Sequence, residues 1–141
     1  MVDTTLLGRK LAQLDVYLDQ LSEFSRLSPA AYKKDWKTQR IVERTLQILV
    51  ELCIDIANHI ISDQGMRLPT GYASTFEVLM ENRVLNRRLS NTMEKMAKFR
   101  NLVVHQYDKI DPAIVVSILR KNLSDFERYK KAIIKHLSSL G

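Results

Sequence analysis

Near the N-terminus, leucine recurs at alternating steps of four and three residues between positions 7 and 21. That spacing places the leucines on one face of an α-helix, because 3.6 residues complete a turn. The pattern predicts a first amphipathic helix whose apolar face packs on the rest of the chain. Ser28-Pro29 then breaks the pattern. The members of this stripe are Leu7, Leu11, Leu14, Leu18 and Leu21.

A longer apolar pattern follows a basic stretch around Trp36 and predicts a second helix from about Asp35 to Ile61. This helix is apolar almost all round, so we expect it to be the central helix, contacted on several sides. Its main stripe is Val42, Leu46, Leu49, Cys53, Ile56 and Ile60, and Ile41, Ile48 and Leu52 widen it.

Loop and cap signals divide the middle of the chain. The segment from Asp63 to Gly71 contains Gly and Pro and is expected to be a loop. Ser74 and Glu77 have the spacing of a capping box, in which each side chain bonds an orphan backbone N–H. A short helix is therefore expected to open at Ser74 and to end near Asn82.

Two further long helices are predicted in the C-terminal half. The first runs from about Asn86 to His105, and Arg100 lies at the border of its apolar face. The second starts at Asp111-Pro112, an N-cap followed by proline at the first helical position. The inward positions are Leu89, Met93, Met96, Phe99 and Val103 in the first, and Val115, Ile118, Phe126, Tyr129, Ile133, Leu137 and Leu140 in the second.

These elements predict an all-α fold in one domain over residues 1–141, an up-and-down bundle of four long helices plus one short helix. Hydrophobic residues make up 45% of the chain, and only four Gly and three Pro are present, which disfavours many strands and turns. The single cysteine, Cys53, excludes an internal disulfide and suits a reducing compartment.

Charge and hydropathy narrow the class further. No apolar run approaches the roughly 20 residues of a membrane span, and the N-terminus lacks a signal-peptide layout, so a cytoplasmic protein without membrane association is expected. Twenty-two Lys and Arg against sixteen Asp and Glu leave a net charge of +6. This charge permits an RNA substrate without requiring one.

The segment from Arg100 to Tyr107 carries the candidate chemistry. Arg100 stays charged and can grip a phosphate with two hydrogen bonds, Asn101 adds an amide donor, and His105 can exchange a proton near neutrality. Five residues separate Arg100 from His105, so an ideal helix aims them about 140° apart. Either the helix is distorted or ends near Val104, or two chains build the site, which we favour. Tyr107 returns to the face of Arg100 if the helix persists.

A structural role for these groups stands beside the catalytic one. A helical arginine usually forms a salt bridge, and a histidine near a helix C-terminus often only complements the dipole. Asp55 could orient Arg100, but an ion pair with Arg44 or Lys98 is as plausible. Neither His59 nor His136 has a metal-ligand partner at a suitable spacing, so no metal or cofactor is expected. Basic positions on one helix could follow an RNA backbone or simply be solvated: Arg83, Arg87, Arg88, Lys95 and Lys98.

The Arg100 to Tyr107 segment resembles the Arg-x4-His-x-Tyr signature of HEPN-domain toxins of the HepT type. Residues 39–60, 76–79 and 99–111 resemble that family in order and spacing, so the resemblance covers nearly the whole chain. The motif itself shows no departure. Asn86, where relatives often carry proline, affects only the start of a helix.

The resemblance implies a homodimeric, metal-independent endoribonuclease toxin, paired with a small MntA-like nucleotidyltransferase antitoxin that transfers AMP onto Tyr107. In the implied mechanism His105 is general base or acid, Arg100 holds the scissile phosphate with help from Asn101, and an adenylyl group on Tyr107 fills the same pocket. Two other classes remain open. The chain could be a non-catalytic nucleotide- or partner-binding subunit of a nucleotidyltransferase complex, or a plain dimerising bundle in which the motif serves packing.

Overall fold

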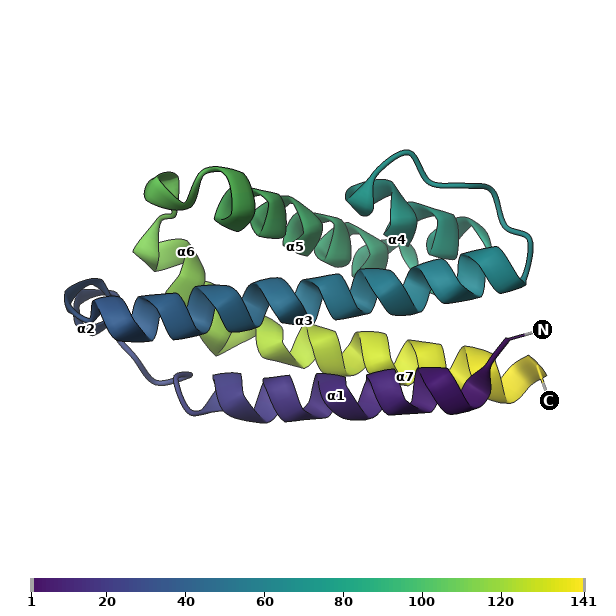
Figure 1. Cartoon of the computed structure of the whole chain (residues 1–141), viewed down its shortest axis with the longest axis horizontal. Coiled ribbons are helices and arrows are strands. Elements are labelled where there is room, and N and C mark those ends of the chain that lie inside the picture. Colours follow the sequence, from purple (N-terminus) through teal and green to yellow (C-terminus); the bar gives the residue numbers. More distant parts are fainter. Residues whose placement is uncertain (1, 141) are drawn as a thin grey trace.

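The computed structural model describes residues 2–140 and shows four long helices running alongside one another (Figure 1). The long helices are α1 (Thr4–Ser22), α3 (Trp36–Asp63), α5 (Arg87–His105) and α7 (Leu123–Leu140). Three shorter ones are α2 (Pro29–Lys34), α4 (Tyr72–Glu81) and α6 (Pro112–Ser117). The described residues form no strand, so the predicted all-α bundle is confirmed, with α2 and α6 as additional short helices.

Polar side chains start these helices where local sequence predicts them to. Asn86 accepts a hydrogen bond from the Leu89 N–H at 2.8 Å, and Asp111 accepts one from the Ala113 N–H at 2.9 Å. The predicted cap at Asp111 is therefore confirmed, and Asn86, predicted only as the approximate start of a helix, caps α5. The predicted start at Ser74 is wrong: α4 begins at Tyr72, and the Ser74 hydroxyl accepts from the Gly71 N–H at 3.0 Å. Ser74 thus closes the first turn from inside the helix.

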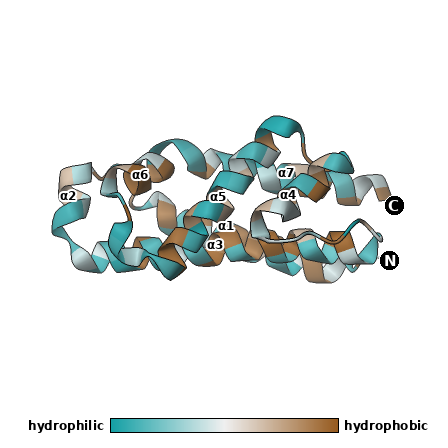
Figure 2. Cartoon of the chain, turned by 90° about the horizontal axis from the view of Figure 1, so that it is seen from above, coloured by the Kyte–Doolittle hydropathy of each residue, from teal (hydrophilic) through white to brown (hydrophobic). Residues whose placement is uncertain are grey.

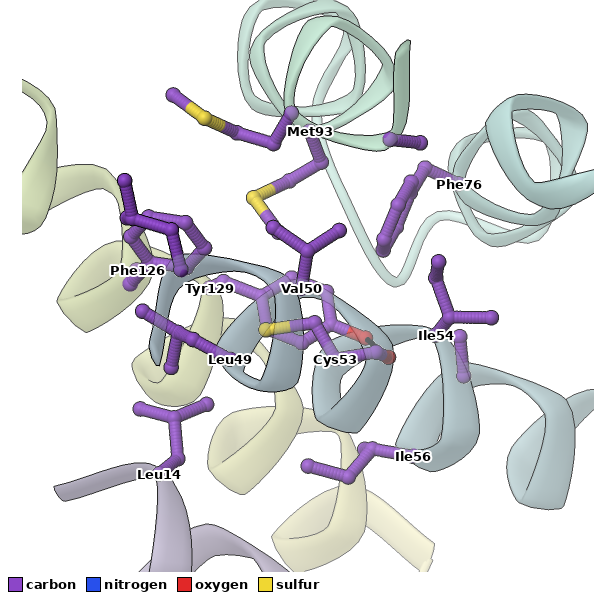
Figure 3. Close-up of a cluster of buried hydrophobic side chains, with 14 of the residues drawn as sticks. Leu14, Leu49, Val50, Cys53, Ile54, Ile56, Phe76, Met93, Phe126 and Tyr129 are labelled. Atoms are coloured by element: carbon purple, nitrogen blue, oxygen red, sulfur yellow. Dashed lines mark hydrogen bonds between the residues drawn. The ribbon is translucent and has the colours of Figure 1, made fainter. Parts of the chain in front are cut away.

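The core forms around α3, which contacts α1, α2, α4 and α5. All five leucines of the first stripe are buried, as are the six residues of the main α3 stripe. Ile41 is 52% exposed, so the expectation that it widens the buried stripe is wrong there. Figure 3 shows Leu14, Cys53 and Phe76 approaching from different helices. The buried Tyr129 hydroxyl donates to the Cys53 carbonyl at 2.8 Å, which ties α7 to α3.

The last predicted helix is divided into three parts. A π-helical turn (Ile118–Asn122) separates α6 from α7 and shifts the inward face, so that Leu119 is buried beside Ile118. The predicted stripe is buried through Ile133 and partly buried at Leu137, whereas Leu140 is 46% exposed. The register change in this turn brings both halves of the C-terminal region onto the core.

Helix α3 is long and apolar enough to cross a membrane by length and composition alone, with a mean hydropathy of 1.3 over its most apolar 18-residue window. Half of that window is buried inside the protein. Hydrophobic residues alternate with hydrophilic ones along the ribbons (Figure 2), as expected of helices that each turn one stripe inward. The α3 composition is that of the core helix of a bundle.

Candidate active site

Arg100 lies where α5 packs on α3, and its side chain is only 14% exposed. The Nε atom donates to Glu51 Oε1 at 2.9 Å, and Nη2 lies 2.8 Å from the same oxygen. The predicted border position therefore does require an anion, and a carboxylate on the central helix provides it. A charge-assisted pair of this kind fixes the plane of the guanidinium.

Two neighbours complete the setting of the guanidinium. Its Nη1 donates to Asn101 Oδ1 at 3.1 Å, and its Cζ lies 4.8 Å from the ring centroid of Tyr72 at the start of α4. An arginine has five N–H groups, and these contacts engage one on each of the three nitrogens. Within residues 2–140, no further acceptor bonds Nη1 or Nη2, so one N–H on each of these nitrogens has no partner. That outer edge is the one that can bind a phosphate with two parallel hydrogen bonds.

Glu51 is itself held in place on α3. Gln47, one turn earlier, donates to Glu51 Oε1 at 3.0 Å. Partial burial raises the pKa of the Glu51 carboxyl, but the hydrogen bonds from Gln47 and Arg100 outweigh it, so the pKa lies below its ordinary value. Glu51 is consequently an anion at neutral pH and a permanent partner for Arg100.

Sequence reasoning missed Glu51 and Tyr72. It considered Asp55 as the partner of Arg100, but Asp55 pairs with Lys10, and His59 Nε2 lies 3.7 Å from its other oxygen. Glu51 and Asp55 lie one turn apart on the same side of α3. The available signal was the second acidic residue one turn before Asp55, although sequence alone does not fix which turn faces Arg100.

His105 is the last residue of α5, and its imidazole is exposed. The helix stays regular to that point, because the Gln106 N–H still bonds the Leu102 carbonyl at 2.8 Å. No distortion turns His105 toward Arg100, so the angle of about 140° holds within one chain. Within residues 2–140, no hydrogen bond or ion pair joins these two predicted site residues.

Tyr107 follows the end of α5, in a short 3-10 helix (Tyr107–Lys109), and is 68% exposed. The condition for its return to the face of Arg100, a helix that persists to Tyr107, is not met, because Gln106 leaves helical geometry (φ −140°, ψ 46°). Tyr107 instead lines a hollow of about 320 Å³ with Tyr32, Arg40 and Glu43. Glu43 precedes Glu51 by eight residues, roughly 12 Å along α3.

The hollow beside Tyr107 combines a cation and an acid. Burial raises the pKa of Glu43, and the Tyr32 hydroxyl donates to its Oε2 at 3.3 Å. Burial likewise raises the pKa of Tyr32, so this phenol remains protonated. Arg40, on the exposed side of α3, supplies positive charge to the same hollow.

The remaining histidines lie elsewhere. His136 Nε2 lies 2.6 Å from Gln64 Oε1, and burial lowers its pKa. His59 faces Asp55. Within residues 2–140, no group of three or more His, Cys, Asp or Glu side chains is arranged to hold a metal ion.

The fold and these side chains define a small helical protein with an anchored arginine and an exposed histidine on one motif helix. The chain matches the family described as "Ribonuclease HepT-like" over residues 14–133. It belongs to that family.

Curated relatives are named as nucleases. The chain is 37% identical to an "mRNA nuclease HepT" of Shewanella oneidensis over 98 residues, covering 70% of this chain and 74% of the relative. It is 30% identical to a "tRNA nuclease HepT" of Aphanizomenon flos-aquae over 143 positions, covering 99% and 95%. A tri-AMPylated Shewanella oneidensis HEPN toxin, solved in complex with an MNT antitoxin, superposes with a TM-score of 0.86 at 29% identity, covering 94% of this chain and 99% of that chain.

Proposed function

We propose that this protein is an endoribonuclease that acts as the toxin of a toxin–antitoxin pair. The observation that carries the proposal is the state of Arg100, whose inner edge is held by Glu51 while its outer edge remains available for a phosphate. His105 is exposed five residues further along the same helix. The nuclease names of two HepT relatives support the same activity.

In the proposed reaction, His105 removes the proton from the ribose 2′-OH, and the 2′-oxygen attacks the adjacent phosphorus. The bond from phosphorus to the 5′-oxygen breaks, and a second imidazole protonates that leaving oxygen. Arg100 binds the non-bridging oxygens and offsets their growing charge, while Asn101 keeps its guanidinium in plane. The products are a 2′,3′-cyclic phosphate and a 5′-hydroxyl, and the need for a 2′-OH restricts the substrate to RNA.

The second imidazole comes from a second copy of the chain. Within one chain Arg100 faces α3 and α4, whereas His105 points about 140° away. A twofold dimer that apposes the ends of two α5 helices brings each His105 to the Arg100 of the other subunit. This arrangement supplies both a general base and a general acid without a metal ion.

Regulation follows from Tyr107. A nucleotidyltransferase antitoxin transfers AMP from ATP to the phenol oxygen and releases pyrophosphate. The phenol is 68% exposed and is therefore accessible to such an enzyme. Within one chain the added phosphate meets Arg40 rather than Arg100. Arg40 lines the hollow of Tyr107 beside Glu43, whereas Arg100 contacts Glu51, roughly 12 Å further along α3. The adduct blocks the binding of RNA at the end of α5. The single free cysteine, Cys53, suits the reducing conditions of the cytoplasm, where this pair acts.

The direct test is cleavage of total RNA by the purified protein in EDTA, followed by analysis of the new 3′ ends. Cleavage that leaves 2′,3′-cyclic phosphates is expected, and a strict requirement for Mg²⁺ would contradict the mechanism. His105→Ala should abolish cleavage without changing the helical circular dichroism. His59→Ala is the matched control, because His59 also lies on a helix and faces only Asp55.

A further inference from the structure

A basic groove lies between the N-terminal half of α5 and α7, in the half of the bundle away from α6 (Figure 1). It has a volume of about 670 Å³. Its floor is apolar, formed by Val84, Leu89 and Ala132, and Thr92 and Ser139 contribute hydroxyl groups. The cations that line this basic groove are Arg83, Arg88, Arg128, Lys131 and Lys135.

The charge of the basic groove is almost uncompensated. Asp125 is its one carboxylate, and Arg128 already binds that carboxylate at 2.9 Å. Between residues 2 and 140, no carboxylate lies within ion-pair distance of the other four cations. Five positive charges against one negative charge leave +4 in this groove, compared with +6 for the whole chain. Solvated helix faces usually mix the two signs, so this segregation favours an anionic ligand.

Arg83 adds a conformational observation. It follows α4 with a φ of +60°, the only positive φ of a non-glycine residue in the described chain. The Val84 N–H bonds the Leu79 carbonyl at 2.9 Å, which is the helix-ending geometry that favours glycine at this place. An arginine at this position raises the conformational energy of the backbone, and its side chain places a positive charge in the wall of the groove.

We propose that the basic groove binds the sugar-phosphate backbone of the RNA substrate, away from the bond that is cleaved. The proposal rests on the proposed function for the identity of the ligand. Guanidinium and ammonium groups meet phosphates, hydroxyl groups reach ribose 2′-OH groups, and the apolar floor accommodates sugar and base surfaces. Contacts to phosphate and sugar carry no sequence information, so the groove should bind RNAs of different sequence with similar affinity.

The distance from the basic groove to Arg100 sets the length of RNA that can bind both places at once. Arg88 precedes Arg100 by twelve residues, roughly 18 Å along α5, and precedes His105 by roughly 25 Å. Phosphates that advance roughly 3.4 Å each cover this distance in roughly five to six steps, so a strand needs about six to seven nucleotides to touch both Arg88 and Arg100. Long RNAs therefore engage groove and cleavage site together, whereas a trinucleotide reaches only one of them.

The test compares two pairs of substitutions with equal charge change. Lys131→Gln with Lys135→Gln removes two groove cations. Arg9→Gln with Arg26→Gln removes two exposed cations, one in α1 and one in the turn after it, that form no ion pair within residues 2–140. Binding of polyuridylate and of a uridine trinucleotide is measured by fluorescence anisotropy in a His105→Ala background, over a range of salt concentrations.

The Lys131→Gln/Lys135→Gln pair should weaken polyuridylate binding about tenfold near 0.1 M salt. The plot of the log of the association constant against log salt should become less steep, by about 1.5. Trinucleotide binding should weaken less, because a trinucleotide has fewer phosphates to contact the groove cations, and the Arg9/Arg26 pair should behave like the parent. Equal losses in both pairs, or an unchanged slope in the groove pair, would overturn the proposal. So would a groove pair that loses only neutralisation by the antitoxin, because the groove would then be a protein interface. Failure of the wild type to cleave any RNA, with polyuridylate binding lost in the groove pair, rejects the nuclease activity but not the groove.

Discussion

Replacing Glu51 by Gln tests how the bundle holds Arg100. The substitution keeps an amide oxygen near Arg100 Nε and removes the charge that lies 2.8 Å from Nη2. Two unit charges whose centres lie about 4 Å apart attract by about 4 kcal/mol at an effective dielectric constant of about 20. Glu51 is 35% exposed and Arg100 14%, so solvent screens part of this energy.

We expect a loss of about 1–2 kcal/mol in the free energy of unfolding, because Arg100 is largely buried and keeps a neutral acceptor. For a chain of this size the melting temperature should fall by roughly 3–8 °C. The larger effect is kinetic. A guanidinium no longer fixed in plane misplaces the phosphate, and kcat should fall about 10- to 100-fold while KM changes less.

The pH dependence of this stability difference has a definite sign. The folded-state pKa of Glu51 lies below its ordinary value of 4.5, so its contribution to stability is fully present above pH 4.5. The contribution is lost as the pH falls through the folded-state pKa, where the carboxyl becomes protonated. Melting curves of the wild type and Glu51→Gln should therefore differ at pH 7 and converge below pH 4.5.

Asp55→Asn is the matched control, because Asp55 lies one turn further along α3. It forms an ion pair with Lys10, and the Asp55 side chain is 46% exposed. It should cost under about 1 kcal/mol and leave kcat unchanged. A lower melting temperature with unchanged kcat in Glu51→Gln would show that the ion pair only stabilises the fold. A raised kcat would show that Glu51 competes with the substrate phosphate, which refutes the reasoning above.

Three further predictions concern other parts of the protein. Arg83→Gly relieves the positive φ and should stabilise the fold by about 0.5–1 kcal/mol, seen as a higher melting temperature, while weakening polyuridylate binding; a lower melting temperature would show that Arg83 is not strained. Mixing His105→Ala with Arg100→Ala subunits should restore part of the RNA cleavage through one intact composite site, and sedimentation should show a dimer; no recovery would argue against a shared site. Co-expression with the nucleotidyltransferase should add the mass of AMP to the peptide that contains Tyr107 and not to that of Tyr107→Phe, and neutralisation without added mass would mean inhibition by binding alone.

The helices were predictable because their signals are local. Asn86 caps α5, and five apolar positions along it all turn inward, so its bounds agree to within one residue. The end of α5 was less predictable. No glycine or proline marks it before Pro112, and the change at Gln106 that separates Tyr107 from Arg100 leaves no compositional sign. The helical period predicts the direction of a side chain only for residues that lie within the helix.

Contacts between distant segments were beyond the sequence for a geometric reason. The choice between Glu51 and Asp55 as the partner of Arg100 depends on how far α5 slides along α3, and one turn of slide, about 5.4 Å, exchanges them. The basic groove poses the same problem, since Arg88 on α5 and Lys131 on α7 line one hollow although α6 separates their helices in the sequence.

The two kinds of cation on α5 differ in the partners that the fold assigns to them. Arg100 has a carboxylate, an amide and an aromatic ring around it, which leaves one edge of defined direction. Arg88 has no carboxylate partner in residues 2–140 and lies exposed in the basic groove. Stabilising a transition state requires a fixed donor geometry, whereas attracting a flexible polyanion requires only local charge. The division of roles along this helix therefore follows from which arginine the bundle binds and which it leaves in solvent.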